Sequence, residues 1–165
     1  MKYLKLTAVL FINLLLLNSC KEEVDKEKPT ISIDFEEAFP QNCDTIYFGE
    51  SFTLKVLFAD NAELGSVSAF SIDIHHNFDQ HSHSTEVVSC DMDDEKKAVN
   101  PWVFIESFDI QEGINEYETS LLITVPDSDS EGKFDEGDYH FFISLTDKEG
   151  WSAQLGLSIK MLYRE

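Results

Sequence analysis

Hydrophobic and polar residues alternate along most of the chain after residue 28. In residues 51–60, the apolar side chains fall at Phe52, Leu54, Val56 and Phe58. A period of two places these side chains on one face of an extended strand. The same alternation recurs in residues 117–125, 139–145 and 151–161, and more weakly in residues 30–35, 66–76, 85–90 and 102–108. Because no stretch of ten or more residues has apolar positions at helical spacing, the pattern predicts an all-β chain.

Turn-forming residues separate these runs. They include Pro40-Gln41-Asn42, Gly49-Glu50, Asn100-Pro101, Glu112-Gly113 and Asp147-Lys148-Glu149-Gly150. Seven or eight short strands at this spacing predict an antiparallel β-sandwich. The end of the chain, with Gly137-Asp138-Tyr139 and then Asp147-x-x-Gly150, resembles the last hairpin of immunoglobulin-like, fibronectin-like and cadherin-like domains. We therefore expect one immunoglobulin-like sandwich over residues 29–165.

The N-terminus has the pattern of an export signal. Lys2 and Lys5 precede an apolar run over residues 6–17, which is too short to span a bilayer. Leu17-Asn18-Ser19-Cys20 follows and resembles a bacterial lipobox, in which the cysteine is acylated after cleavage. This predicts a signal peptide over residues 1–19 and a lipid anchor on Cys20. The alternative is an ordinary secretory signal with an incidental Cys20.

Residues 20–28 are almost all charged, so they cannot bury surface and should form a solvated tether. The tether begins with Lys21-Glu22-Glu23, which resembles the signal that sends Bacteroidetes lipoproteins to the outer cell surface. We expect attachment to the outer membrane, exposed on the cell surface. Attachment facing the periplasm is the alternative.

The charge and the two remaining cysteines narrow the picture. The formal net charge is −20, which repels nucleic acid and attracts cations. Cys43 and Cys90 are left as a pair in an oxidising compartment, so we predict a disulfide bond between them. Thiolate metal ligands are the alternative. The sequence indicates no particular protein partner.

Histidines are concentrated in one short segment. The chain holds five, and four of them lie from His75 to His83. Neutral imidazole is a preferred ligand of Zn and Cu, and the period of a strand would direct His81 and His83 to the same side. One of His75 and His76 could complete the site, and Asp79 and Glu86 lie within reach as ligands or as acceptors that orient a ring. The alternative is a polar surface loop without metal.

The fifth histidine, His140, lies on a predicted strand, opposite the stripe of Tyr139, Phe141 and Ile143. Ordinary strand alternation would leave His140 facing solvent. It could add a ligand only if its strand neighbours that of His75.

The chain as a whole is similar to an uncharacterised Bacteroidetes lipoprotein family, known as a domain of unknown function, with an immunoglobulin-like domain. The resemblance rests on the lipobox, Lys28-Pro29-Thr30-Ile31, Phe39-Pro40-x-x-Cys43, Glu63-Leu64-Gly65-Ser66, His75-His76-Asn77-Phe78-Asp79-x-His81-Ser82-His83-Ser84-Thr85-Glu86 and Gly137-Asp138-Tyr139-His140-Phe141. In that family a histidine is common where this chain has Gln80. The resemblance implies a fold and a location but no activity.

A second cation site is suggested by residues 127–138, which follow the D-x-D-x-x-G spacing of a calcium loop. The candidate ligands are Asp127, Asp129, Glu131 and Asp138. Position five is Glu and position twelve is Asp, and the flanking residues read as strands. An acidic turn without Ca is the favoured alternative.

Three functions follow from these features. The first is a surface lipoprotein that binds Zn or Cu, for metal capture or relay. The second is an adhesion or ligand-binding module, argued from the fold alone. The third, a metal enzyme, is not expected, because no nucleophile or acid–base pair accompanies the histidines.

Overall fold

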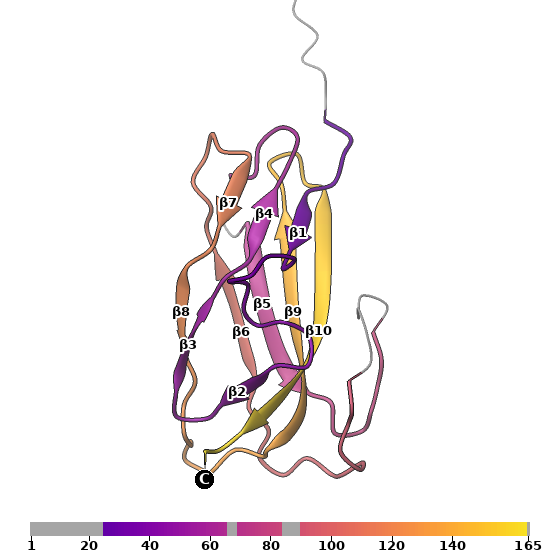
Figure 1. Ribbon diagram of the computed structural model, residues 1–165, viewed down its shortest axis with the longest axis vertical. Helices are drawn as coiled ribbons and strands as arrows, with labels where there is room; N and C mark the ends of the chain where they lie inside the picture. The colour runs from indigo at the N-terminus through magenta and orange to yellow at the C-terminus, as the bar shows by residue number, and fades with distance from the viewer. Residues whose placement is uncertain (1–24, 66–68, 84–89, 165) are drawn as a thin grey trace, which may run out of the picture.

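The computed structural model describes residues 25–65, 69–83 and 90–164, and these residues form an all-β, sandwich-like fold (Figure 1). Their strands are β1 (Thr30–Ser32), β2 (Thr45–Tyr47), β3 (Ser51–Leu54), β4 (Leu57–Ala59), β5 (Phe70–His76), β6 (Phe104–Phe108), β7 (Glu116–Glu118), β8 (Leu121–Thr124), β9 (Gly137–Thr146) and β10 (Ser152–Leu162). In this described part of the chain, no helix is long and apolar enough to cross a membrane.

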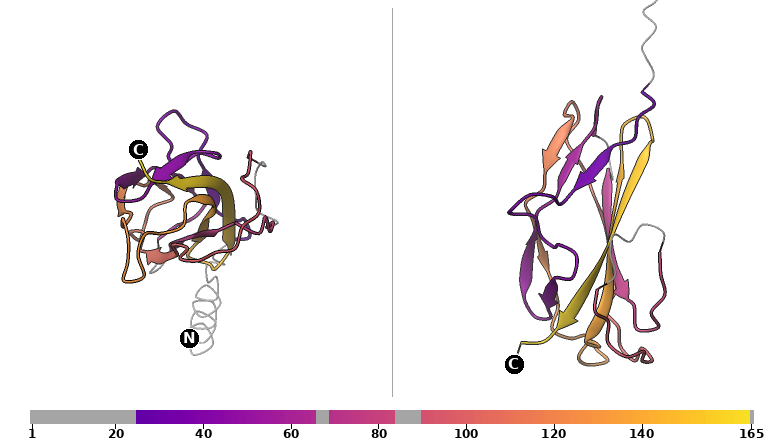
Figure 2. Two further views of the ribbon diagram at one scale, coloured as in Figure 1. Left: turned by 90° about the horizontal axis from the view of Figure 1, so that it is seen from below. Right: turned by 45° about the vertical axis from the view of Figure 1, so that its right-hand side comes forward.

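Two layers face each other across the core (Figure 2). One layer is a five-stranded sheet in the order β2-β10-β9-β5-β6. The other is divided into a three-stranded sheet, β1-β4-β7, and a two-stranded sheet, β3-β8. All pairings are antiparallel except that of β2 with β10, which is parallel. The long β9 and β10 form the spine of the larger sheet.

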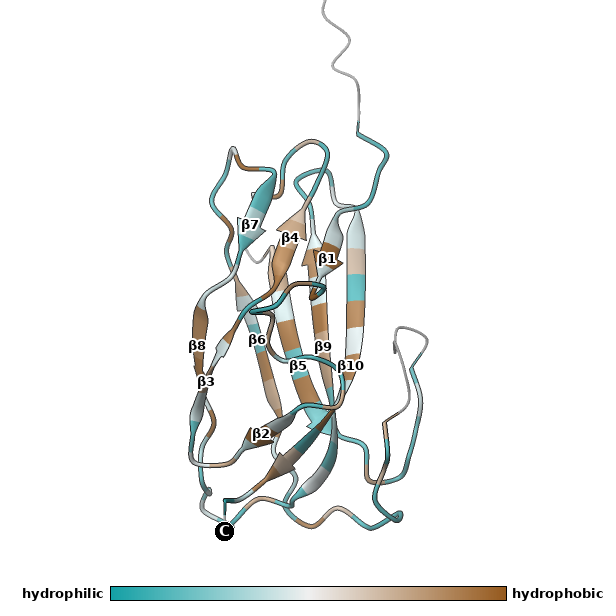
Figure 3. Cartoon of the chain, in the orientation of Figure 1, coloured by the Kyte–Doolittle hydropathy of each residue, from teal (hydrophilic) through white to brown (hydrophobic). Residues whose placement is uncertain are grey.

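Hydrophobic and polar residues follow one another along strands such as β5 (Figure 3), and the apolar residues supply the core, as the alternation predicts. On β9, Tyr139, Phe141, Ile143 and Leu145 are fully buried. They meet Leu54, Val56 and Phe58 from the opposite layer, together with Ile72 and Ile74 of β5 and Leu157, Ile159 and Met161 of β10. The intervening residues of β5 and β9 point to the outer face of the large sheet. That outer face carries the histidines.

Two of the predicted strands are each interrupted. The run over residues 51–60 becomes β3 and β4, and the run over residues 117–125 becomes β7 and β8. At the break, the Thr119 hydroxyl donates to the Leu54 carbonyl and accepts from the Val56 amide, both at 2.9 Å. The side chain thus replaces ladder bonds where the chain passes between the small sheets. Because of these breaks and the short β2, ten strands lie in the described residues, where seven or eight are predicted.

The disulfide prediction is confirmed. Cys43 and Cys90 are bonded, with their Cα atoms 5.6 Å apart. The bond joins the segment before β2 to the connection between β5 and β6. The side-chain amide of Asn42 makes two bonds: its Nδ2 donates to Cys90 Sγ at 3.2 Å, and its Oδ1 accepts from the backbone amide of Ser158 in β10. The long β5–β6 connection is therefore tied to the large sheet. The predicted lipidation site, Cys20, and the predicted signal peptide lie outside the described residues.

Candidate metal centre

The pairing of β5 with β9 brings together two histidines that are 65 positions apart by number. His75 and His140 are direct cross-strand partners in this antiparallel pair, and their ring centroids lie 5.3 Å apart. Both belong to the outward face, because Ile74 and Phe141 on either side of them are buried in the core. The condition that we set for His140, a strand adjacent to that of His75, is met.

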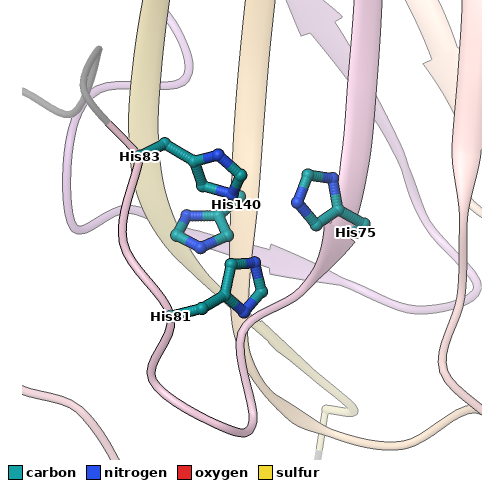
Figure 4. Close-up of side chains that lie close together, drawn as sticks. All are labelled: His75, His81, His83 and His140. Carbon is teal, nitrogen blue, oxygen red and sulfur yellow. The ribbon is translucent and has the colours of Figure 1, made fainter.

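His81 and His83 approach the same point from the connection that follows β5. The four ring centroids lie between 4.7 and 5.8 Å from one another. One ring nitrogen can be chosen from each of His75, His81, His83 and His140 so that all four lie within 4.8 Å of one another. Figure 4 shows these rings turned toward a common centre, two from strands and two from the connection. We refer to these four residues as the histidine group.

Contacts near the start of the β5–β6 connection hold it against the large sheet. Asn77 donates its amide to the Asp138 carbonyl at 2.8 Å, and Gln80 bonds to the Asp93 carbonyl at 3.0 Å. Lys160 of β10 pairs with both Asp93 and Asp138, at 2.6 and 2.7 Å. Gln80 has a φ of 52°, which turns the chain back toward the sheet. Gln80 serves this turn and is not part of the histidine group.

Two carboxylates orient rings of the group. His81 Nδ1 lies 2.6 Å from Asp79 Oδ1, and His75 Nδ1 lies 2.8 Å from Asp73 Oδ1. A carboxylate that accepts from Nδ1 selects the tautomer whose Nε2 can coordinate a metal. The hydrogen bond from His81 also lowers the pKa of Asp79. Asp79 therefore lies where it can orient the His81 ring, which is one of the two roles that the sequence leaves open.

Asp73 was missed by sequence reasoning, although its spacing is informative. Asp73-x-His75 and Asp79-x-His81 repeat the same pattern, and in each a carboxylate two positions before a histidine bonds to its ring. On a strand, residues two apart share a face, so Asp73 could have been placed beside His75.

His140 is the innermost member of the group. It has no exposed surface, although its strand face points away from the core, because the connection lies over it. Burial, followed by the nearby rings of His81, His75 and His83, lowers the pKa of His140 to about 4. At neutral pH this imidazole is therefore uncharged, as coordination requires. The expectation of a solvent-facing His140 is wrong, since alternation cannot foresee a covering segment.

An open depression of about 340 Å³ borders the group on the outer face of the large sheet. Its lining consists of Ser71, Asp73, His75, His83, Ile105, Phe142, Ser144 and Gln154. Phe142 packs against His83 with ring centroids 4.7 Å apart and against His75 at 5.6 Å. The Phe142 ring limits the orientations of the two imidazoles. The depression gives the histidine group an entry path from solvent.

Two other predicted ligands fall elsewhere. His76 lies beyond the group, with its ring stacked on Phe78 at 4.9 Å and its Nδ1 3.5 Å from the Phe78 amide. Adjacent strand residues point to opposite faces, so His75 and His76 could not both join one site. Glu86 lies outside the described residues.

The proposed calcium loop over residues 127–138 is not gathered around a point. Asp129 Oδ1 instead accepts from the Glu131 and Gly132 amides, which closes a turn. Asp138 is buried and ion-paired to Lys160. Among the described residues, the acidic and histidine side chains whose ligand atoms converge are the histidine group and a separate set of three aspartates. Asp127, Asp129, Glu131 and Asp138 belong to neither set.

Comparison with known proteins gives a family but no activity. A family model described as a domain of unknown function (DUF4625) matches residues 18–162. No curated protein and no solved structure matches. The match agrees with the expected family of unassigned function. The Bacteroidetes and lipoprotein parts of the resemblance stay predictions.

Proposed function

The chain belongs to the DUF4625 family, and from the geometry of the histidine group we propose that it binds a divalent transition-metal ion. The proposal rests above all on four imidazoles with ring nitrogens within 4.8 Å of one another. Zn–N bonds of about 2.0–2.1 Å place the nitrogens of a tetrahedral site roughly 3.4 Å apart. Small rotations of exposed His83 and half-buried His81 would close the difference.

The donor set favours Zn or Cu(II). Neutral imidazole suits both ions, whereas Ca and Mg prefer oxygen. Asp73 and Asp79 add negative charge beside the ligands without taking up coordination positions. At a common nitrogen site Cu(II) binds more tightly than Zn, so we expect Cu(II) to displace Zn in competition.

The number of ligands favours holding an ion over catalysis. Four protein ligands complete a tetrahedral sphere, whereas catalytic zinc sites keep a position open for water or substrate. We therefore assign metal binding and capture, not an enzymatic reaction. The adjacent depression along Phe142 and Ile105 would admit a ligand that takes the ion from the exposed side.

The location that we propose follows from the N-terminal sequence. An acylated Cys20 and the charged residues after it would attach the domain to the outer membrane at the cell surface. The strong negative charge would concentrate cations near the site. The partner that supplies or receives the ion stays unassigned.

The decisive experiment is elemental analysis of protein purified without a polyhistidine tag, after exposure to Zn²⁺ or Cu²⁺ and desalting. We expect one ion per chain. His81→Ala combined with His83→Ala removes half of the ligands and should abolish retention, with circular dichroism and thermal unfolding close to wild type, because both side chains lie on the surface connection.

His76→Ala is the matched control, because this histidine neighbours the group in sequence but stacks on Phe78 instead. It should retain the ion. Unchanged uptake in the double variant, or equal loss in His76→Ala, would contradict the ligand assignment.

A further inference from the structure

Three aspartates meet at one end of the sandwich, far from the histidine group. One carboxylate oxygen from each of Asp25, Asp60 and Asp147 can be chosen so that the three lie within 4.8 Å of one another. Asp25 precedes β1, Asp60 directly follows β4, and Asp147 directly follows β9. Figure 1 shows these three segments at the same end of the molecule. We call them the aspartate group.

Each carboxylate is anchored through one oxygen. Asp60 Oδ2 accepts from the amides of Ala62 and Glu63, at 2.7 and 2.9 Å. Asp147 Oδ1 accepts from the Trp151 amide at 2.8 Å. Asp25 Oδ1 accepts from the Glu27 amide at 3.0 Å and from the Asn61 side chain at 2.8 Å. These bonds, most of them from backbone amides, fix the three side chains. The backbone therefore holds the three carboxylates close to one another.

Among the described residues, the second oxygen of each carboxylate is left without a hydrogen-bond partner. Asp25 Oδ2, Asp60 Oδ1 and Asp147 Oδ2 are buried and receive no hydrogen bond within the described part of the protein. Asp147 is 2% exposed and Asp60 is 9% exposed. None of the three forms an ion pair with a described lysine, arginine or histidine; the nearby Lys148 pairs with Glu63 at 2.6 Å.

Anionic oxygens that are withdrawn from water and face one another repel, and they are stable only with a counter-charge or a shared proton. We propose that the aspartate group binds a hard divalent cation, Ca²⁺. The three free oxygens supply ligands of the type that Ca²⁺ prefers, and the group offers neither nitrogen nor sulfur.

Ca²⁺ is favoured over Mg²⁺ because it accepts six to eight oxygens in flexible geometry, whereas Mg²⁺ demands a near-ideal octahedron. Three carboxylates leave room for backbone oxygens or water. Such a site belongs with extracellular modules, whose dissociation constants are about 10⁻⁴ to 10⁻³ M.

The ion would join the N-terminal segment to the sandwich. Asp25 already touches the β9–β10 turn, since its carbonyl accepts from Trp151 Nε1 at 3.2 Å. With Ca²⁺ bound, Asp25 would also be joined to the ends of β4 and β9. This inference is independent of the histidine group.

The test is a titration of the purified protein with CaCl₂, followed by tryptophan fluorescence and by thermal unfolding. Trp151 contacts two of the three aspartates and reports on the site. At about 10 mM Ca²⁺, which is about 10 to 100 times this dissociation constant, we expect the melting temperature to rise by about 5 to 10 °C. Zn²⁺ at stoichiometric concentration should not reproduce this rise in the His81→Ala, His83→Ala variant.

Asp60→Asn and Asp147→Asn are the informative variants. Each removes one charge from the repelling set, so each should melt at or above the wild-type temperature without Ca²⁺ and should show little rise with it. Asp129→Asn, in the turn over residues 127–138, is the matched control and should respond like wild type. A folded wild type with no response to Ca²⁺ would overturn the proposal. A full response in both the Asp60→Asn and the Asp147→Asn variant would also overturn it. The metal content of the histidine group is measured separately, so neither outcome bears on that site.

Discussion

The histidine group and the aspartate group are assembled in different ways. Two histidines are set by the register of β5 and β9, and a surface connection brings the other two. The aspartates all stand where a strand or segment ends, and each is held by backbone amides or a neighbouring side chain. His140 is the fourth residue of β9 and Asp147 directly follows the strand, so the two are seven residues, or about 23 Å, apart along it.

The difference separates two kinds of selectivity within one small domain. Nitrogen donors select borderline ions such as Zn and Cu(II), and carboxylates select Ca²⁺. The histidine group depends on how a long connection is held over a sheet, whereas the aspartate group depends on short turns. Conditions that loosen the connection or protonate imidazole should therefore affect one site and spare the other.

Acid should produce the largest contrast. Between about pH 7.5 and about pH 5, we expect the affinity for Zn or Cu(II) to fall at least about 100-fold, because protons compete with the ion for the imidazole nitrogens. His140, with a pKa of about 4, should remain neutral throughout. Ca²⁺ binding should change little, since the hydrogen bond from Asn61 lowers the pKa of Asp25. Calorimetry at both pH values measures both affinities, and equal losses would remove the distinction.

Removing the disulfide should have the next largest effect. Cys43→Ser with Cys90→Ser releases the middle of the β5–β6 connection, which carries His81 and His83. The chain-entropy cost is about 3–4 kcal/mol of unfolding free energy, measurable by urea denaturation. Below the denaturation range, we expect about tenfold weaker Zn²⁺ binding and unchanged Ca²⁺ binding. A loss of both affinities in the folded variant would show that the sites are coupled.

The supporting carboxylates should give the smallest effect. Asp73→Asn and Asp79→Asn each weaken the orientation of one ring, for an expected loss of about tenfold in Zn²⁺ affinity. Asp94→Asn removes the same charge from an exposed position of the connection and should be nearly silent. If all three variants lost affinity equally, net charge rather than ring orientation would explain the effect.

Much of the fold could be predicted, because alternation reports directly on which face of a strand is buried. The runs at residues 139–145 and 151–161 correspond to β9 and β10. The break near Thr119 could not be predicted, since it depends on a side-chain hydroxyl that meets residues 63 and 65 positions away. The three-residue β2 is too short for a periodic signal, and its parallel partner is the end of β10.

The candidate site was predictable only where its signal is local. The density of histidines pointed to His75, His81 and His83, but His140 joins them through a strand pairing that one sequence does not encode locally. The aspartate group has no local signal at all, because its members come from three distant turns. The spacing of residues 127–138 suggested a calcium loop instead, yet there the side chains close a turn and pair with Lys160.

The direct pairing of His75 with His140 makes metal retention a test of correct folding. If the register between β5 and β9 slipped by one residue, His140 would point toward the core. It would then no longer lie beside His75 on the outer face. A misregistered chain would then lack a ligand that no surface loop can replace. An ion bound by all four imidazoles stabilises only the native alignment of β5 with β9. The metal would therefore favour the correct register of the sheet.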